Sequence, residues 1–598
     1  MASEVVPTRE TLPAGETWDL SHLFLDEEAW ARQGEAVLAE ANEVAALAGH
    51  LAEGARRVAD ALEGEDRLTL LAERYLCYAS FRHDQDTQDS TGVALEQKSR
   101  QVAARASEAV AFIRPELVQL PEGTLERWLG EEPRLGPYRH TLEEIIRRRR
   151  HWLSPEVEAA LSAFGPALDG AAQAAAQLAN ADFDFGDVRD EAGKARPLSH
   201  GRYGLYLSGQ DRVLRQNAYR AMLAMYASHR HTFAATLAQV AEVDGTTARL
   251  RHYPSALAMR LDERNLPEQV YPALLEAIHQ SLPTLHRYLA WRRRQLGVDR
   301  LHFFDLAVPV VDDDARFSWP EATGLVQEAV SPLGPDYQRR LAAYLQQRAI
   351  DYLENRGKRS GAYSSDVYDV HPYILMTYTG ERQSVFTLIH ELGHAMHSLL
   401  AASHQSVRNA RYPIFLAEVA STANEHLLLG HMLERAQSRQ ERLLLLDSLA
   451  RDYLGTVYRQ AFFAEFEQGF HAAHESGEPL TAESISAIYR RTIDAFYGEA
   501  VAVDAETEME WARIPHFYFS FYVFQYATGF LAAAALMEKV RQEGAAQAAR
   551  YTEFLSLGGS MDPLPALRLA GVDMADPASL ASGLAGFARL VKELEELT

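Results

Sequence analysis

The chain has 598 residues, too many for one ordinary domain, so we expect two or more lobes. Hydrophobic residues make up 47% of it, enough for a large core, and 83 acidic against 59 basic residues give a formal charge of -24. This balance argues against a nucleic-acid partner, because phosphate binding needs clustered Lys and Arg. We find no apolar run long enough to span a membrane and no secretory signal, and the single cysteine, Cys77, excludes an intrachain disulfide. These features predict a cytoplasmic protein with no membrane partner.

The first third of the chain predicts a helical lobe. From Glu27 to about Ala181 the sequence is rich in Ala, Leu, Glu and Arg, with apolar residues at helical spacing. At 183–207, FDFGDVRDEAGKARPLSHGRYGLYL, glycine, aspartate and aromatic residues replace this pattern and predict a β-hairpin. We place a domain boundary there, which divides the chain into 1–182 and 183–598.

Helical patterns resume after the hairpin and are interrupted once more before the C-terminal half. SSDVYDVHPYILMTYTG, residues 364–380, is rich in β-prone residues and predicts a small antiparallel β patch. An ordinary sheet strand explains HPYILMTYTG as well as an edge strand that pairs with an extended peptide does. After Gln383 the chain reads as helical almost to its end, so the predicted fold class is mainly α.

The stretch HELGHAMH, His390 to His397, predicts a metal site. It lies in VFTLIHELGHAMHSLL, which is apolar on most sides and predicts a buried helix over 384–400. His390 and His394 are four residues apart, so both imidazoles can converge on one metal ion. Glu391 lies about 100° further round the axis and can reach a water on that metal, as in the H-E-x-x-H arrangement. Two core histidines bonded to backbone carbonyls are the alternative.

A catalytic zinc usually takes three protein ligands, so a third is needed. We argue against His397, because it lies about 10 Å along the helix from His390 and their side chains do not converge easily. Glu418 lies in the apolar part of the next predicted helix, 412–432, where an unpaired carboxylate would be unfavourable. The predicted ligands are therefore His390, His394 and Glu418.

Two further polar residues have two readings each. Glu425 follows Glu418 by two helical turns and lies on the same side of the predicted helix. Glu425 and His397 either orient the metal ligands or are a helix-surface acid and a core histidine. The sequence does not decide between these readings.

Several segments together resemble the oligoendopeptidase F family of thimet-oligopeptidase-like zinc peptidases. They are HPYILMTYTG, VFTLIHELGHAMHS, YPIFLAEVASTANE, YRQAFFAEFE at 458–467, RIPHFYFSFYVFQYATGF at 513–530 and ETWDLSHLF near the N-terminus. The resemblance covers nearly the whole chain. It implies two helical lobes flanking a deep substrate channel, with an N-terminal lobe that restricts entry to short peptides. It also implies one Zn²⁺ per chain, held by His390, His394 and Glu418.

The aromatic segment 513–530 has a structural and a functional reading. Tyr522 and Tyr526 share a face if the segment is helical, and an aromatic core helix whose phenols find partners explains them. The family resemblance instead implies that His516 and Tyr522 bind the substrate carbonyl and the oxyanion, with Tyr526 as an additional contact.

The resemblance implies a zinc endopeptidase that hydrolyses internal bonds of short oligopeptides, with Glu391 as the general base. A helical zinc metallocarboxypeptidase would also carry the zinc motif. A non-catalytic peptide-binding protein with an accidental motif is a third alternative.

Overall fold

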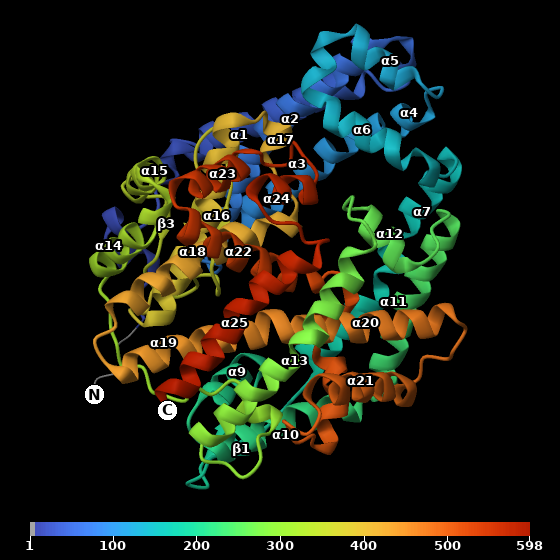
Figure 1. Ribbon diagram of the computed structural model, residues 1–598. Coiled ribbons are helices and arrows are strands. Elements are labelled where there is room, and N and C mark those ends of the chain that lie inside the picture. The colour runs from blue at the N-terminus through green and yellow to red at the C-terminus, as the bar shows by residue number, and fades with distance from the viewer. Residues whose placement is uncertain (1–5) are drawn as a thin grey trace. The chain divides into compact units, whose positions relative to one another are not determined.

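The structure, a computed structural model, describes residues 6–598 and consists mainly of α-helices, which confirms the predicted fold class (Figure 1). The chain forms two compact units of three segments each. The first comprises Met1–Trp152, Asp314–Leu428 and Leu536–Gly571, and the second comprises Leu153–Asp313, Leu429–Ala535 and Val572–Thr598. These units interleave along the chain, whereas the predicted domains divide it once, between residues 182 and 183; that division stays a prediction. Among the described residues, no helix has the length and hydropathy needed to cross a membrane.

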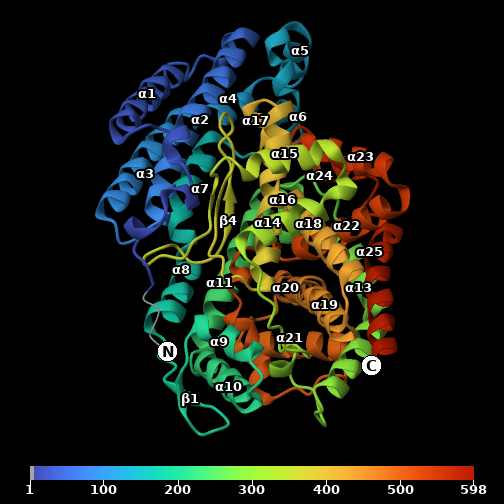
Figure 2. The same ribbon diagram turned by 90° about the vertical axis from the view of Figure 1, so that its left-hand side faces the viewer.

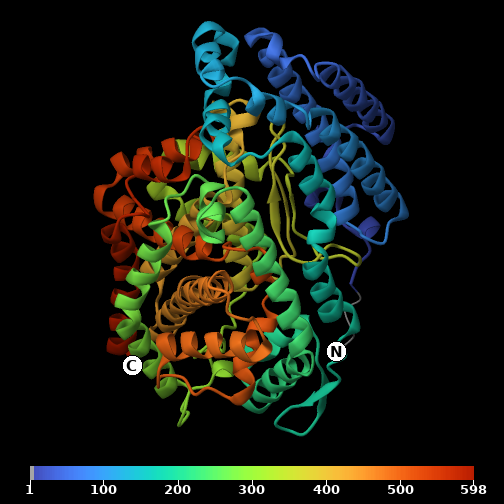
Figure 3. The same cartoon turned by 90° about the vertical axis from the view of Figure 1, so that its right-hand side faces the viewer.

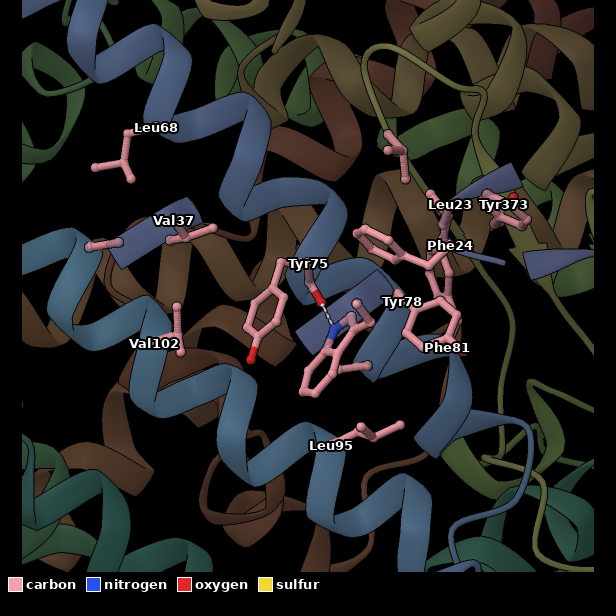
Figure 4. Close-up of a cluster of buried hydrophobic side chains, with 14 of the residues drawn as sticks. Leu23, Phe24, Val37, Leu68, Tyr75, Tyr78, Phe81, Leu95, Val102 and Tyr373 are labelled. Atoms are coloured by element: carbon pink, nitrogen blue, oxygen red, sulfur yellow. Dashed lines mark hydrogen bonds between the residues drawn. The ribbon is translucent and has the colours of Figure 1, made fainter. Parts of the chain in front are cut away.

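An aromatic cluster holds the N-terminal helices of the first unit together (Figure 4). The indole of Trp30 stacks on Tyr75, with 4.4 Å between ring centroids, and donates its N–H to the Tyr75 carbonyl. The cluster extends to Phe81, whose ring lies 5.0 Å from that of Tyr373 in the sheet. The cluster joins α1 (Glu27–Ala45), α2 (Ala55–Asp84) and α3 (Ser90–Val110). A second hydrophobic cluster packs α4 (Ile113–Gln119), α5 (Thr124–Glu131) and α6 (Arg139–Arg148) against the end of α1 and the start of α2.

Three short strands form the β patch beside the helix that carries the H-E-x-x-H sequence (Figure 2). β5 (Tyr373–Leu375) lies between β3 (Ile350–Asp351), its parallel neighbour, and β4 (Tyr363–Ser365), its antiparallel neighbour. The antiparallel pairing is confirmed, and the third strand makes the sheet mixed. All three β5 residues are buried, which accounts for the continuous apolar sequence YIL.

The rest of the first unit surrounds the predicted metal-binding helix. That helix is α16 (Arg382–His404), which contains the predicted span 384–400. Its neighbours are α14 (Trp319–Ala329), α15 (Pro335–Leu345), α17 (Val407–Ala410), the first part of α18 (Ile414–Arg435) and α23 (Ala545–Ser556), and α24 (Pro563–Ala570) packs against α23.

Gly393 lets α16 and α18 approach backbone to backbone. A Cβ atom at this position would lie 2.6 Å from Ser421 Cα and 2.7 Å from the Ala420 carbonyl oxygen. Beside this contact, the Asn424 side chain donates a hydrogen bond to the Ile389 carbonyl, with 3.4 Å between nitrogen and oxygen. The contact fixes which residues of α18 face the histidines of α16.

The second unit contains the predicted hairpin and a bundle of longer helices. β1 (Asp187–Arg189) and β2 (Ala195–Pro197) pair antiparallel, which confirms the hairpin (teal in Figure 3). Arg292 and Asp447, both buried, form an ion pair of 3.0 Å that joins two helices. The helices are α7 (Pro155–Leu168), α8 (Gly170–Gln177), α9 (His200–Ser208), α10 (Arg212–Ser228), α11 (Arg230–Leu250), α12 (Ala256–Asp262), α13 (Val270–Gln295), α19 (Arg439–Asp452), α20 (Arg459–Glu475), α21 (Ala482–Tyr497), the first part of α22 (Phe524–Glu543) and α25 (Pro577–Leu597).

We expect Gly393→Ala to lower the free energy of unfolding by about 1–3 kcal/mol, because the added methyl group overpacks the contact with Ser421 and Ala420. Urea unfolding followed by circular dichroism measures the change. Gly430→Ala in α18 is the matched control, since a Cβ there meets nothing within 4 Å. An equal effect of the two substitutions would contradict the close approach at Gly393.

Candidate functional site

The three predicted metal ligands lie together in the first unit. His390 and His394 on α16 present Nε2 atoms that lie 3.5 Å and 3.8 Å from Oε2 of Glu418 on α18. One donor atom from each residue lies within 4.8 Å of the other two. Ligands of a tetrahedral zinc ion, about 2 Å from the metal, lie roughly 3.3 Å from one another. The donor atoms therefore need only small side-chain movements to hold one ion.

Glu425 contacts the His390 imidazole at Nδ1, whereas the other ring nitrogen, Nε2, faces Glu418. The Oε1 atom of Glu425 lies 3.0 Å from Nδ1 of His390, so the carboxylate can accept a hydrogen bond from Nδ1–H. Burial of His390 opposes its protonation, but this hydrogen bond and the carboxylates of Glu425, Glu391 and Glu418 outweigh burial and raise its pKa to about 9. Of the two readings of Glu425, the structure supports the orienting one.

Glu391 is buried next to this group of donors. Its side chain is only 6% exposed, and burial raises its pKa to about 7, although the neighbouring His390 acts in the opposite direction. The backbone of Ser364 on β4 lies close enough to this carboxyl group to oppose part of the rise in its pKa. A carboxyl group that titrates near neutrality can both accept and return a proton.

His397 lies outside the donor group and belongs to the core. Its ring stacks on Tyr412, with 3.6 Å between centroids, and neither ring nitrogen has a hydrogen-bond partner among residues 6–598. Burial lowers its pKa to about 3, so the imidazole is neutral. The structure thus supports the core reading of His397.

The three aromatic candidates lie together in the second unit. His516 is on a 3-10 turn (Pro515–Tyr518), and its ring centroid lies 6.3 Å from that of Tyr522 and 6.1 Å from that of Tyr526. The hydroxyl oxygens of Tyr522 and Tyr526 are 3.5 Å apart. Tyr522 precedes α22, which begins at Phe524, so a turn and not one helix face brings the two phenols together. Burial lowers the pKa of His516.

Sequence reasoning missed three residues that shape these groups. Gly393 sits inside a helix, where glycine costs about 1 kcal/mol relative to alanine, and that cost signals a close backbone approach. Glu467 lies in the apolar helix sequence AFFAEFE, where the burial argument used for Glu418 applies equally. No sequence signal identifies Ser364, because its contact with Glu391 uses only the backbone.

Comparison with known proteins gives the same assignment along the chain. Residues 205–585 match Peptidase family M3, and residues 116–185 match Oligopeptidase F. Oligopeptidase PepF of Bacillus subtilis is 37% identical over 593 residues, which cover 99% of this chain and 88% of the relative. Oligoendopeptidase F homolog of Lactococcus lactis is 36% identical over 97% of each chain.

Solved structures agree with these matches. A crystal structure from Chlamydophila abortus has a TM-score of 0.91 and 34% identity, covering 99% of this chain and 100% of its own. The crystal structure of oligoendopeptidase-F from Enterococcus faecium has a TM-score of 0.74 and 33% identity, covering 96% and 99%. With matches of this extent and identity, the chain belongs to peptidase family M3 and, within it, to the oligoendopeptidase F proteins.

Proposed function

We propose that this protein is a zinc-dependent endopeptidase that hydrolyses internal peptide bonds of short oligopeptides. The observation that carries the proposal is the convergence of His390, His394 and Glu418 beside the buried carboxyl group of Glu391. The names of the relatives, oligopeptidase and oligoendopeptidase, support oligopeptide substrates and internal cleavage. A cytoplasmic location and a substrate channel that admits only short peptides are part of the same proposal.

The donor set fits zinc. Two imidazole nitrogens and one carboxylate oxygen are ligands that zinc accepts in catalytic sites, where a fourth position stays open. The hydrogen bond from His390 Nδ1 to Glu425 leaves the correct nitrogen available. When bound, a zinc ion supplies Lewis-acid chemistry, because it acidifies water and polarises the scissile carbonyl group.

The protein's own residues divide the remaining work. Glu391 takes the proton from the attacking water and returns it to the leaving amine, a role that suits its raised pKa. Tyr522 and His516 donate hydrogen bonds to the substrate carbonyl as negative charge develops on it, with Tyr526 as an additional contact.

The strand β4 offers a place for the substrate backbone. HPYILMTYTG contributes the central strand β5, which overturns its reading as an edge strand. Within the described sheet β4 pairs only with β5, and we propose that an extended peptide pairs with the other edge of β4. Main-chain pairing there would bind peptides with little regard for their side chains. Because Ser364 belongs to this strand, the bound peptide would lie close to the general base.

Cleavage of blocked peptides tests the proposed reaction. We expect the full-length protein to cut a peptide of about ten residues that is acetylated and amidated, and to lose this activity with a zinc chelator and regain it with added zinc. Mass spectrometry of the products identifies the bond that is cut. A protein that trims only free C-termini is a carboxypeptidase, and one that binds but never cuts is a peptide-binding protein.

Substitution of the general base separates catalysis from metal binding. We expect Glu391→Gln to keep its zinc and to lose about 10²–10⁴-fold in turnover, because the amide cannot accept the proton. Metal analysis and steady-state kinetics on the same sample measure both effects. Normal turnover of this variant would exclude Glu391 as the base.

The ligand assignment makes a separate prediction about zinc affinity. We expect Glu418→Ala to weaken zinc binding far more than His397→Leu, because Glu418 lies with the imidazoles and His397 stacks in the core. Competition with a chromophoric chelator measures both affinities. The reverse order would overturn the choice of third ligand.

A further inference from the structure

The backbone just before Tyr522 has a conformation that phenylalanine rarely adopts. Phe521 has φ of 54°, in the left-handed region, where a side chain crowds the following carbonyl group. Such a conformation persists only when surrounding contacts hold it. The contacts of Phe521 and its neighbours therefore decide where the ring of Tyr522 lies.

Glu467 on α20 holds the turn from its N-terminal side. The backbone N–H of Phe521 donates to Glu467 Oε1, with 2.7 Å between nitrogen and oxygen, and both groups are buried. The Phe521 ring is also buried, 4.7 Å from the ring of His471 and 5.9 Å from that of Tyr271. The N–H and the ring are thus fixed by different neighbours.

Gln525 holds the other side of the turn. Its side-chain amide donates to the Tyr522 carbonyl at 3.1 Å, and its backbone N–H donates to the same oxygen at 3.2 Å. The Gln525 side chain is only 4% exposed. Two buried side chains therefore bind the peptide groups on both sides of Tyr522, while its own ring is only half-buried.

Glu467 is a poor candidate for a simple ion-pair partner. Burial raises its pKa well above the usual range, although the backbone hydrogen bond opposes this shift. Arg260 is already paired with Asp244 at 2.6 Å. A neutral Glu467 offers its carbonyl oxygen to the Phe521 N–H, and a glutamine amide can supply the same acceptor.

We infer that Glu467 is a positioning residue for Tyr522, acting through the Phe521 N–H with Gln525 as its counterpart at the Tyr522 carbonyl. It holds the phenol in the place from which its hydroxyl acts on the substrate. This inference rests on the proposed function of Tyr522. Its geometric part, the fixation of the turn, stands independently of that function.

Two substitutions of Glu467 separate the effect of side-chain length from the effect of the carboxyl group. Glu467→Gln keeps the acceptor at the same distance, and we expect its kcat to stay within about threefold of the parent value. Glu467→Asp keeps the acid but is one methylene too short, and we expect kcat to fall about 10–100-fold with little change in KM or zinc content, because a small displacement of a catalytic group has effects of this size.

Glu465→Asp is the matched control. Glu465 lies on the same helix, is partly exposed and binds His279, and we expect normal kinetics from this variant. A wild-type kcat for Glu467→Asp overturns the inference, and so does a Glu467→Gln variant as slow as Glu467→Asp. If Glu467→Asp does not fold, Gln525→Leu takes its place: a similar loss of kcat supports the inference, and an unchanged kcat overturns it.

Two measurements distinguish this inference from the proposed function. Hydrogen exchange of a peptide covering 517–524 includes the Phe521 amide, and we expect this peptide to exchange faster in Glu467→Asp but not in Glu467→Gln. If Tyr522→Phe alone leaves turnover unchanged, the proposed role of Tyr522 fails, whereas unchanged exchange in Glu467→Asp refutes the positioning. If both hold, Glu467→Asp combined with Tyr522→Phe is no slower than Tyr522→Phe; multiplied effects would contradict the inference.

Discussion

The contact between α16 and α18 at Gly393 is the constraint on which the grouping of His390, His394 and Glu418 depends. At this point the two backbones meet without side chains between them, since a Cβ would lie 2.6 Å from Ser421 Cα. The contact sets the register of α18 against α16. Because Glu418 and Glu425 are two helical turns apart, one register places Glu418 beside both imidazoles and Glu425 behind His390. A single close approach thus places both a proposed ligand and the carboxylate that hydrogen-bonds another proposed ligand.

The electrostatics of this group favour a cation. Burial and the neighbouring charges shift the pKa values in opposite directions: His390 is raised to about 9, Glu391 is raised to about 7 and His394 is lowered to about 4. Several acids and bases crowded in one partly buried place compete for protons. A bound metal ion would hold His390 as the neutral ligand and Glu418 as the carboxylate, and so resolve this competition.

Local sequence patterns predicted the features that depend on residues close together in the chain, such as helices. Helical periodicity identified α16, and the cost of burying a charge identified Glu418 as a ligand candidate. The parallel pairing of β3 with β5 could not be predicted, because β3 has only two residues and so carries no periodic pattern. The prediction that Tyr522 and Tyr526 share a helix face was conditional on the segment being helical, and α22 begins only at Phe524. The left-handed Phe521 and its hydrogen bond to Glu467 depend on tertiary contacts that periodicity does not report.

The interleaved segments of the two units have a consequence for biosynthesis. The helix α16 packs against α23: the ring of His397 lies 5.8 Å from Phe554, and Gln405 donates to the Ser556 carbonyl. During synthesis, residues 545–556 leave the ribosome after the histidines and Glu418. Until then α16 lacks the helix α23 that packs against it. The proposed site is therefore complete only near the end of translation. An unfinished chain is then not exposed to peptidase activity from its own site.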